Sequence, residues 1–297
     1  MRKNGKSGSV RPRGKCIFCG GGNLSHEHLW PEWMHPLLPQ DPSDSHVSFV
    51  RKSDYFGGEK VVEHTTVPHR GPIRAYTLRR VCRKCNETWM SKIEEQAKGT
   101  LESLMFSKKI TLDRTQIERL AAWFALKAMM FEYAGHPDSL TIPKSDYDYI
   151  RSSLLAPKHW RMWMGSQNSA EWVMRCFNLP TTTVFLSDLP NNIGPNRPRK
   201  CNVLTTSFGL GQLFAYVSLS NAPRLLDKHD ATIDNSSTPG GEPGMLKIWP
   251  YCGDVAWPRS FFLSTIDLDE IANSINSISG DVPPQFREAV SIQKEPL

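Results

Sequence analysis

Two Cys-x-x-Cys pairs carry the strongest chemical signal in this chain. Cys16 and Cys19 form the first pair, Cys82 and Cys85 form the second, and the other three cysteines are scattered. Four thiolates in two such pairs suit one tetrahedral structural zinc ion. The spacing therefore predicts a single zinc site that closes the 62 residues between Cys19 and Cys82 into a loop.

Polar residues of catalytic type stand beside both pairs. Glu27 and His28 follow the first pair closely, and Asn86 comes directly after Cys85. Closure of the loop by zinc would bring these three side chains near one another. A carboxylate and an amide oxygen suit a hard divalent cation such as Mg²⁺ or Mn²⁺, and an imidazole can act as a general base. The pattern favours a second, catalytic metal site over a plain zinc finger.

The order and adjacency of these motifs resemble the HNH (His-Me finger) nuclease superfamily. The resemblance is to members in which a four-cysteine zinc clamps the ββα-metal motif. The matching segments are Cys16-Ile-Phe-Cys19, Glu27-His28-Leu29-Trp30-Pro31 and Cys82-Arg-Lys-Cys85-Asn86. The continuation Trp89-Met90-Ser91 with Glu94 also resembles a group of uncharacterised bacterial HNH proteins. The resemblance covers roughly residues 14–107, with a weaker echo as far as Tyr133.

The resemblance implies a role for each of the three polar residues. His28 would be the general base that activates water, Glu27 the acidic metal ligand, and Asn86 the closing metal ligand. A bound Mg²⁺ or Mn²⁺ would stabilise the leaving 3′-oxygen and the charge on the phosphate.

One element of the family pattern is missing. The central Asn cannot be placed, because residues 29–81 contain no asparagine. Three histidines could substitute, although a surface position is the favoured interpretation for each: His46, His64 and His69. Of these, His69 is nearest to the second cysteine pair. His26 is an alternative ligand, and Glu94 either supports the site or is an exposed helical acid.

Basic charge is concentrated beside the cysteine pairs. The chain has a net charge of +6, and residues 1–15 carry six basic residues and no acid. A second acid-free run holds Arg70, Arg74, Arg79, Arg80, Arg83 and Lys84. Positive charge near a metal site fits a nucleic-acid backbone as partner. The alternatives are a solubilising tail and a solvated strand face.

The chain has the composition of a cytoplasmic protein. It holds no run of about 18 apolar residues, so we expect no membrane span. The basic N-terminus has no apolar stretch after it and does not resemble a secretory signal. An odd count of 7 cysteines suits a reducing compartment better than a disulfide framework.

We expect an α+β fold in four parts: a disordered basic arm at 1–14, a zinc-clamped HNH module at 15–107, a helical connector at 108–156, and a β-rich α+β C-terminal domain of unknown role at 157–297. A hairpin is predicted at 47–51 and 60–67, followed by a strand at 73–81. Helical spacing predicts a helix from Asn86 or Glu87 to about 104. A capping-box pattern at 115–118 predicts a second helix that ends near Tyr133.

Strands dominate the predicted C-terminal half, after a short helix at 146–155. Alternation predicts strands at 160–164, 171–178, 183–187, 201–207 and 212–218, with a turn at 207–211. We expect loops at 188–200 and 222–244, because both are rich in Pro, Gly and Asn. Asp267 is expected to cap a final helix.

The sequence therefore predicts a metal-dependent HNH-type endonuclease that hydrolyses phosphodiester bonds in DNA, in a setting such as defence against foreign DNA. A homodimer is a possible assembly. Two alternatives stay open: a non-catalytic zinc-ribbon protein that binds nucleic acid, and an HNH nuclease that acts on RNA. A binding protein would not need His28. Trp30, Trp33 and Trp89 could stack on bases, but packing beneath the zinc is the favoured interpretation.

Overall fold

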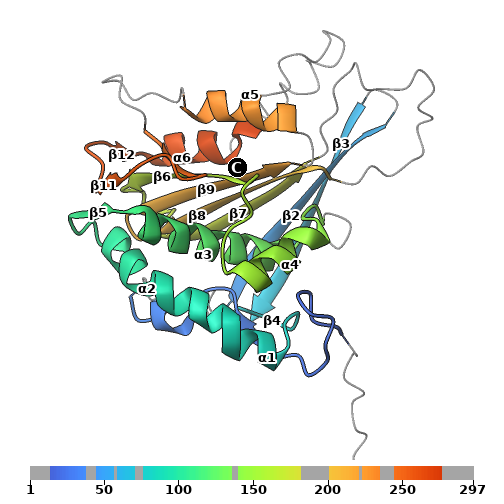
Figure 1. Ribbon diagram of the computed structural model, residues 1–297. Coiled ribbons are helices and arrows are strands. Elements are labelled where there is room, and N and C mark those ends of the chain that lie inside the picture. Colours follow the sequence, from blue (N-terminus) through green and yellow to red (C-terminus); the bar gives the residue numbers. More distant parts are fainter. Residues whose placement is uncertain are drawn as a thin grey trace, which may run out of the picture.

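The computed structural model describes residues 14–37, 45–56, 59–70, 76–135, 140–181, 201–220, 223–234 and 244–275. It is a mixed α+β structure with a four-cysteine cluster near the N-terminus, a helical middle and a curled, half-barrel sheet in the C-terminal part (Figure 1). The expected arm at 1–14 lies almost wholly outside the described residues. The predicted strand 183–187 and the predicted loop 188–200 lie entirely outside them.

Two short strands hold the N-terminal region together. β1 (Glu27–His28) pairs antiparallel with β4 (Thr77–Leu78), so that His28 lies opposite Thr77. The chain between them forms a long two-stranded ribbon of β2 (Ser45–Phe56) and β3 (Glu59–Arg70), which projects from the body (Figure 1). The ribbon confirms the predicted hairpin and extends it at both ends. The predicted strand at 73–81 is only the two residues of β4 in the described chain.

A run of helix follows the second cysteine pair. It consists of α1 (Arg83–Cys85), the π-helical turn η3 (Asn86–Met90) and α2 (Ser91–Met105). The helix begins three residues before the predicted start at Asn86, because the sulfur of Cys82 accepts a hydrogen bond from the Cys85 amide and caps it. π-helical turns are common at functional sites, and this one begins with Asn86.

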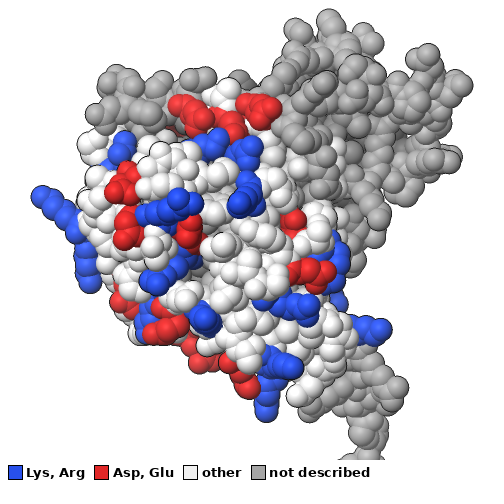
Figure 2. All heavy atoms as spheres, in the orientation of Figure 1, with Lys and Arg blue, Asp and Glu red and all other residues white. Residues whose placement is uncertain are grey.

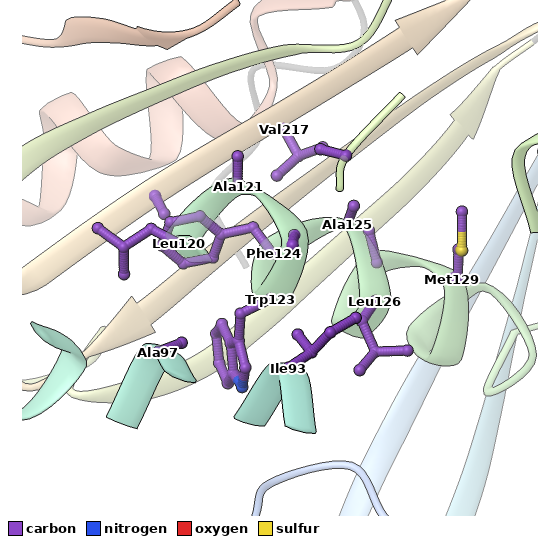
Figure 3. Packing of buried hydrophobic residues seen from close by; sticks show 14 of the residues in the cluster. Ile93, Ala97, Leu120, Ala121, Trp123, Phe124, Ala125, Leu126, Met129 and Val217 are labelled. Atoms are coloured by element: carbon purple, nitrogen blue, oxygen red, sulfur yellow. The ribbon is translucent and has the colours of Figure 1, made fainter. Parts of the chain in front are cut away.

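Helix α3 (Arg114–Glu132) lies at the centre of the protein and is buried on nearly all sides. Figure 3 shows Trp123 directed towards Ile93 and Ala97 of α2, whereas Ala121 and Ala125 approach Val217 of the sheet. The capping box is formed by Asp113 and Gln116, which exchange side-chain and backbone hydrogen bonds. The predicted box at 115–118 was therefore wrong by two residues. The helix ends within one residue of the predicted end.

The C-terminal sheet has six strands, and α3 covers one face while α5 (Pro223–Asp234) and α6 (Thr265–Ala272) cover the other (Figure 1). The spatial order is β10-β6-β9-β8-β7, and β12 pairs parallel with β6. The strands are β6 (Arg161–Gln167), β7 (Met174–Thr181), β8 (Val203–Leu210), β9 (Leu213–Ser220), β10 (Leu246–Trp249) and β12 (Phe262–Leu263). A separate small pair joins β5 (Ile110–Leu112) to β11 (Val255–Trp257).

Sequence patterns located four of the sheet strands but predicted none of β10, β11 and β12, and they misread two further features. The loop expected at 222–244 contains α5, which begins with a proline, a residue that suits the first turn of a helix. The final helix is capped by Ser264 rather than Asp267, which occupies the third helical position and completes a capping box. The predicted helix at 146–155 is α4 (Lys144–Ser153). Among helices in the described residues, none has both the length and the apolarity to cross a bilayer.

Candidate active site beside a four-cysteine cluster

The four paired cysteines converge as their spacing predicts. The Sγ atoms of Cys16, Cys19, Cys82 and Cys85 all lie within 4.8 Å of one another, and none forms a disulfide. A tetrahedral zinc with Zn–S bonds of about 2.3 Å would place its sulfur ligands about 3.8 Å apart. The cluster is therefore consistent with a structural zinc site.

Backbone amides support the sulfur atoms. The Gly21 amide donates to Cys19 Sγ at 3.4 Å, and the Cys85 amide donates to Cys82 Sγ at 3.4 Å. Gly20 permits the turn after Cys19 because its φ of +72° is in the left-handed region. Burial raises the pKa of the Cys19 thiol, but hydrogen bonds from Gly21 and the neighbouring thiols outweigh it and lower the pKa to about 7. This favours the thiolate form of Cys19, whereas burial raises the pKa of the Cys82 and Cys85 thiols.

The cluster brings Glu27 and Asn86 together. The Ser25 amide donates to the Val81 carbonyl at 2.8 Å, which places β1 beside the chain that leads into the second cysteine pair. The Asn86 side-chain amide donates to Ser25 Oγ at 3.4 Å and lies close enough to the Glu27 carboxylate to lower its pKa. A carboxylate and an amide, both able to supply oxygen ligands, therefore meet between β1 and the start of the helix.

His28 is adjacent to Glu27 on β1, and its ring has different contacts. Its Nε2 lies 3.2 Å from Oε1 of Glu32, in η1 (Glu32–Met34), and its ring centroid lies 5.3 Å from that of His35. Its Nδ1 is buried and has no hydrogen-bond partner among the described residues. The Glu32 carboxylate beside Nε2 favours the tautomer that carries its hydrogen on Nε2, which leaves a free lone pair on Nδ1. That nitrogen keeps a free lone pair, but it is closed to solvent in this arrangement.

A buried lysine completes the site from α3. Lys127 is fully buried, and its Nζ lies 2.6 Å from Oε1 of Glu94 and 3.7 Å from Oε1 of Glu27. The same atom lies 3.5 Å from the carbonyl oxygen of His28. Glu94 was expected either to support the site or to be an exposed helical acid. It contacts Lys127, which in turn contacts Glu27, so the structure agrees with the first of these roles. No motif in the sequence marks Lys127, which stands among the apolar residues of α3.

Two signals in the sequence could have identified the residues that were missed. A single lysine amid apolar residues on a buried helix requires a buried acidic partner, because an unpaired buried charge is very costly. Glu32 stands four residues after His28, a spacing at which side chains meet when the chain is helical. A proline at 31 is compatible with such a turn.

Glu27 is short of positive charge in this arrangement. Burial raises its pKa, and repulsion from Glu94 adds to the effect. Attraction by Lys127 and hydrogen bonds from Asn86 and Lys127 lower the pKa, but they do not cancel the rise. A further cation beside Glu27 would stabilise the carboxylate.

The other residues considered from the sequence are placed as follows. His26 is exposed. His46 lies opposite His69 in the ribbon, and His64 lies opposite Arg51, but their side chains are outside the described part of the structure. Aromatic packing accounts for two of the tryptophans. Trp30 packs on Phe131 with ring centroids 5.2 Å apart, and Trp89 packs edge-on against Phe18 at 4.8 Å. Trp33 is partly buried and lies beside Lys98, whose Nζ is 5.6 Å from its ring.

Charged side chains on the face shown in Figure 2 are mixed in sign. Lys and Arg are interspersed with Asp and Glu over the described surface of this side, without one continuous basic patch. The face therefore does not indicate a phosphate-rich partner by itself. The basic run at residues 1–15 remains the main sequence feature that does so.

Comparison of the chain with protein-family models, with curated proteins and with solved structures gave no match.

Proposed function

We propose that this protein is a metal-dependent endonuclease of the HNH type that hydrolyses phosphodiester bonds in DNA. One observation supports it above the others. A four-cysteine cluster, a β1–β4 pair and the following helix bring together Glu27 and Asn86, with His28 next on the same strand. This is the arrangement that the resemblance to the superfamily implies for a ββα-metal module.

The residues present fit a hard divalent cation. Glu27 supplies carboxylate oxygens, and the side-chain amide of Asn86 lies beside it and would turn its oxygen to the ion. The Glu27 carboxylate lacks full compensation of its charge. In this proposal they would hold Mg²⁺ or Mn²⁺. When bound, such an ion supplies stabilisation of the charge that develops on the phosphate and on the leaving 3′-oxygen.

His28 supplies the base. Once the ring turns so that Nδ1 meets solvent, this nitrogen takes a proton from a water molecule whose oxygen attacks phosphorus, and the bond from phosphorus to the 3′-oxygen breaks. The proton resides on the imidazole, where the carboxylate of Glu32 at Nε2 stabilises the positive charge. The leaving oxygen takes up a proton, and loss of the His28 proton to solvent restores the base.

Cleavage of plasmid DNA and of structured RNA tests the proposal. Each substrate is incubated with the purified protein plus Mg²⁺ or Mn²⁺, with the His28→Ala protein and a chelator control alongside. Metal-dependent nicking of the plasmid by the wild type alone supports a DNA nuclease. Cleavage of RNA alone would reassign the substrate. Binding of either nucleic acid with no cleavage, and no difference between the two proteins, would favour a non-catalytic zinc-ribbon protein.

A further inference from the structure

We infer that Lys127 is a positioning residue that sets the charge of the proposed nuclease site, so that Glu27 receives a single divalent cation and the site still accepts a phosphodiester. The inference rests on the proposed function. Lys127 comes from α3, outside the 14–107 segment that resembles HNH proteins, and it contacts acids from both elements of the site. Glu27 belongs to β1 and Glu94 to α2.

Lys127 lies closer to Glu94 than to Glu27. Nζ is in direct contact with Glu94 at 2.6 Å, whereas its separation from Glu27 is 3.7 Å. The ammonium is fully buried, so water does not screen either interaction effectively. Lys127 therefore attracts both carboxylates, Glu94 more strongly than Glu27, and a single ammonium leaves one of the two negative charges for another cation.

The resulting balance of charge suits a phosphodiester substrate. With both carboxylates ionised, Glu27, Glu94 and Lys127 together carry one net negative charge. A divalent cation makes the site positive by one, and a phosphodiester then makes it neutral. Without the lysine, the same cation would neutralise the site and the phosphate would leave a net negative charge. The positive charge of Lys127 thus offsets the negative charge that the phosphodiester brings to the site.

Lys127 also fixes the strand that carries the base. Its Nζ lies 3.5 Å from the carbonyl oxygen of His28, so one side chain ties α3 both to the backbone of β1 and to the carboxylate on α2. The base and the proposed metal ligand are adjacent residues on that strand. A shift of β1 would therefore move both together.

The affinity of the zinc-loaded protein for Mn²⁺ tests the inference without any cleavage. Electron paramagnetic resonance at constant ionic strength measures this affinity. Three variants change the charge of the site in steps: Lys127→Met, Glu94→Gln, and the two combined. Lys127→Met should tighten Mn²⁺ binding at least about tenfold, and Glu94→Gln should weaken it by a similar factor. The double variant, which restores the wild-type net charge, should return to within about threefold of the wild type.

The inference would be overturned if the Mn²⁺ affinities of the variants did not follow the net charge of the site. Weaker binding than the wild type in both single variants would also overturn it. If Lys127→Met does not fold, the double variant still decides, because it should bind Mn²⁺ more tightly than Glu94→Gln. The outcome is separate from the nuclease test. Charge-ordered Mn²⁺ binding without cleavage would refute the nuclease, whereas His28-dependent cleavage with affinities indifferent to Lys127 would refute only the role of the lysine.

Discussion

The Nε2 atom of His28 lies 3.2 Å from the carboxylate of Glu32, four residues further along the chain. The strand that carries His28 ends there, Pro31 follows, and Glu32 begins the 3-10 helix η1. This change from strand to helix turns the carboxylate back onto the imidazole. The contact leaves Nδ1 as the basic nitrogen, which is the atom with no partner among the described residues.

Loss of the Glu32 carboxylate should slow cleavage modestly. The side chain is 79% exposed, so water screens the pair and its contribution is that of a surface ion pair. We expect Glu32→Ala to lower the cleavage rate about two- to fivefold, measured under single-turnover conditions. Glu87→Ala is a matched control, because Glu87 pairs with Arg83 at the same spacing on an exposed helix. Equal rates for Glu32→Ala and the control would remove Glu32 from the site.

Replacement of His28 should abolish cleavage without unfolding the protein. Removal of a general base typically lowers the rate by ~10²–10⁴-fold, and we expect His28→Ala to fall in this range. Zinc content and affinity for DNA should be nearly unchanged, and both can be measured on the same preparation. A His28→Ala protein that cuts as fast as the wild type would show that the catalytic assignment is wrong.

Substitutions of His26 and Glu27 distinguish which of the two residues is the metal ligand. His26 is exposed, whereas Glu27 is buried against Asn86 and Lys127. His26→Ala should therefore cut at the wild-type rate, and Glu27→Ala should lose activity that raised Mn²⁺ partly restores. Loss of activity in His26→Ala together with wild-type activity in Glu27→Ala would assign the ligand role to His26.

One zinc per chain is expected in the purified wild-type protein. Cys82→Ser should release it and unfold the N-terminal region, because a structural zinc supplies much of the folding free energy of such a module. Cys252→Ser serves as the matched control, since that cysteine is exposed and lies outside the cluster. Elemental analysis gives the zinc content, and circular dichroism reports the loss of structure. Wild-type protein that contains no zinc would contradict the assignment of the cluster.

The basic arm should add affinity for nucleic acid without sequence preference. Deletion of residues 1–14 removes five positive charges: Arg2, Lys3, Lys6, Arg11 and Arg13. Each charge that contacts a phosphate contributes about one unit to the slope of log K against log salt concentration. The truncated protein should therefore bind more weakly, with a shallower slope and the same cleavage positions. An unchanged slope would mean that the arm does not contact nucleic acid, and a changed cleavage pattern would mean that it reads sequence.

A buried histidine in the C-terminal part should make stability depend on pH. His229 of α5 lies between Tyr216, Ser218 and Ser274, and burial lowers its pKa from 6.5 to about 4. Between these values the unfolded chain binds a proton that the folded chain does not. Stability should therefore be complete above about pH 6.5 and should fall by up to about 3 kcal/mol as the pH drops towards 4.

Urea unfolding at a series of pH values measures this dependence. His229→Gln should be less stable at neutral pH, but its free energy of unfolding should fall less steeply with decreasing pH, by about one proton. The comparison is between slopes, so a general loss of stability does not obscure it. Equal slopes for the wild type and the variant would show that another group titrates in this range.

Local patterns predicted the elements of this fold well. The cysteine spacing predicted the cluster, alternation predicted four of the sheet strands, and the start of α3 was misplaced only because Asp113 and Gln116 form a better capping box than residues 115–118. The order of strands in the sheet was not predictable in this way. It depends on pairings such as β6 with β9 and β6 with β10, which join residues far apart in the chain.

Contacts between distant segments also explain what sequence patterns missed at the site. Glu27, His28 and Asn86 are adjacent to the cysteine pairs, so a short-range pattern was sufficient to select them. Lys127 is separated from His28 by 99 positions, and it reaches the site only because α3 packs between α2 and the sheet (Figure 3). Burial of a charged side chain becomes informative only when the packing that buries it is known.

The ribbon of β2 and β3 enters and leaves the body of the protein between two fixed points. The β1–β4 pair closes its base, and the cysteine cluster ties the flanking chain on both sides. Insertions or deletions along the ribbon would leave these anchor points, and the residues held beside them, where they are. The ribbon is therefore a part of this protein whose length can change at little cost to the proposed chemistry, and a convenient place to graft a peptide tag or a recognition element.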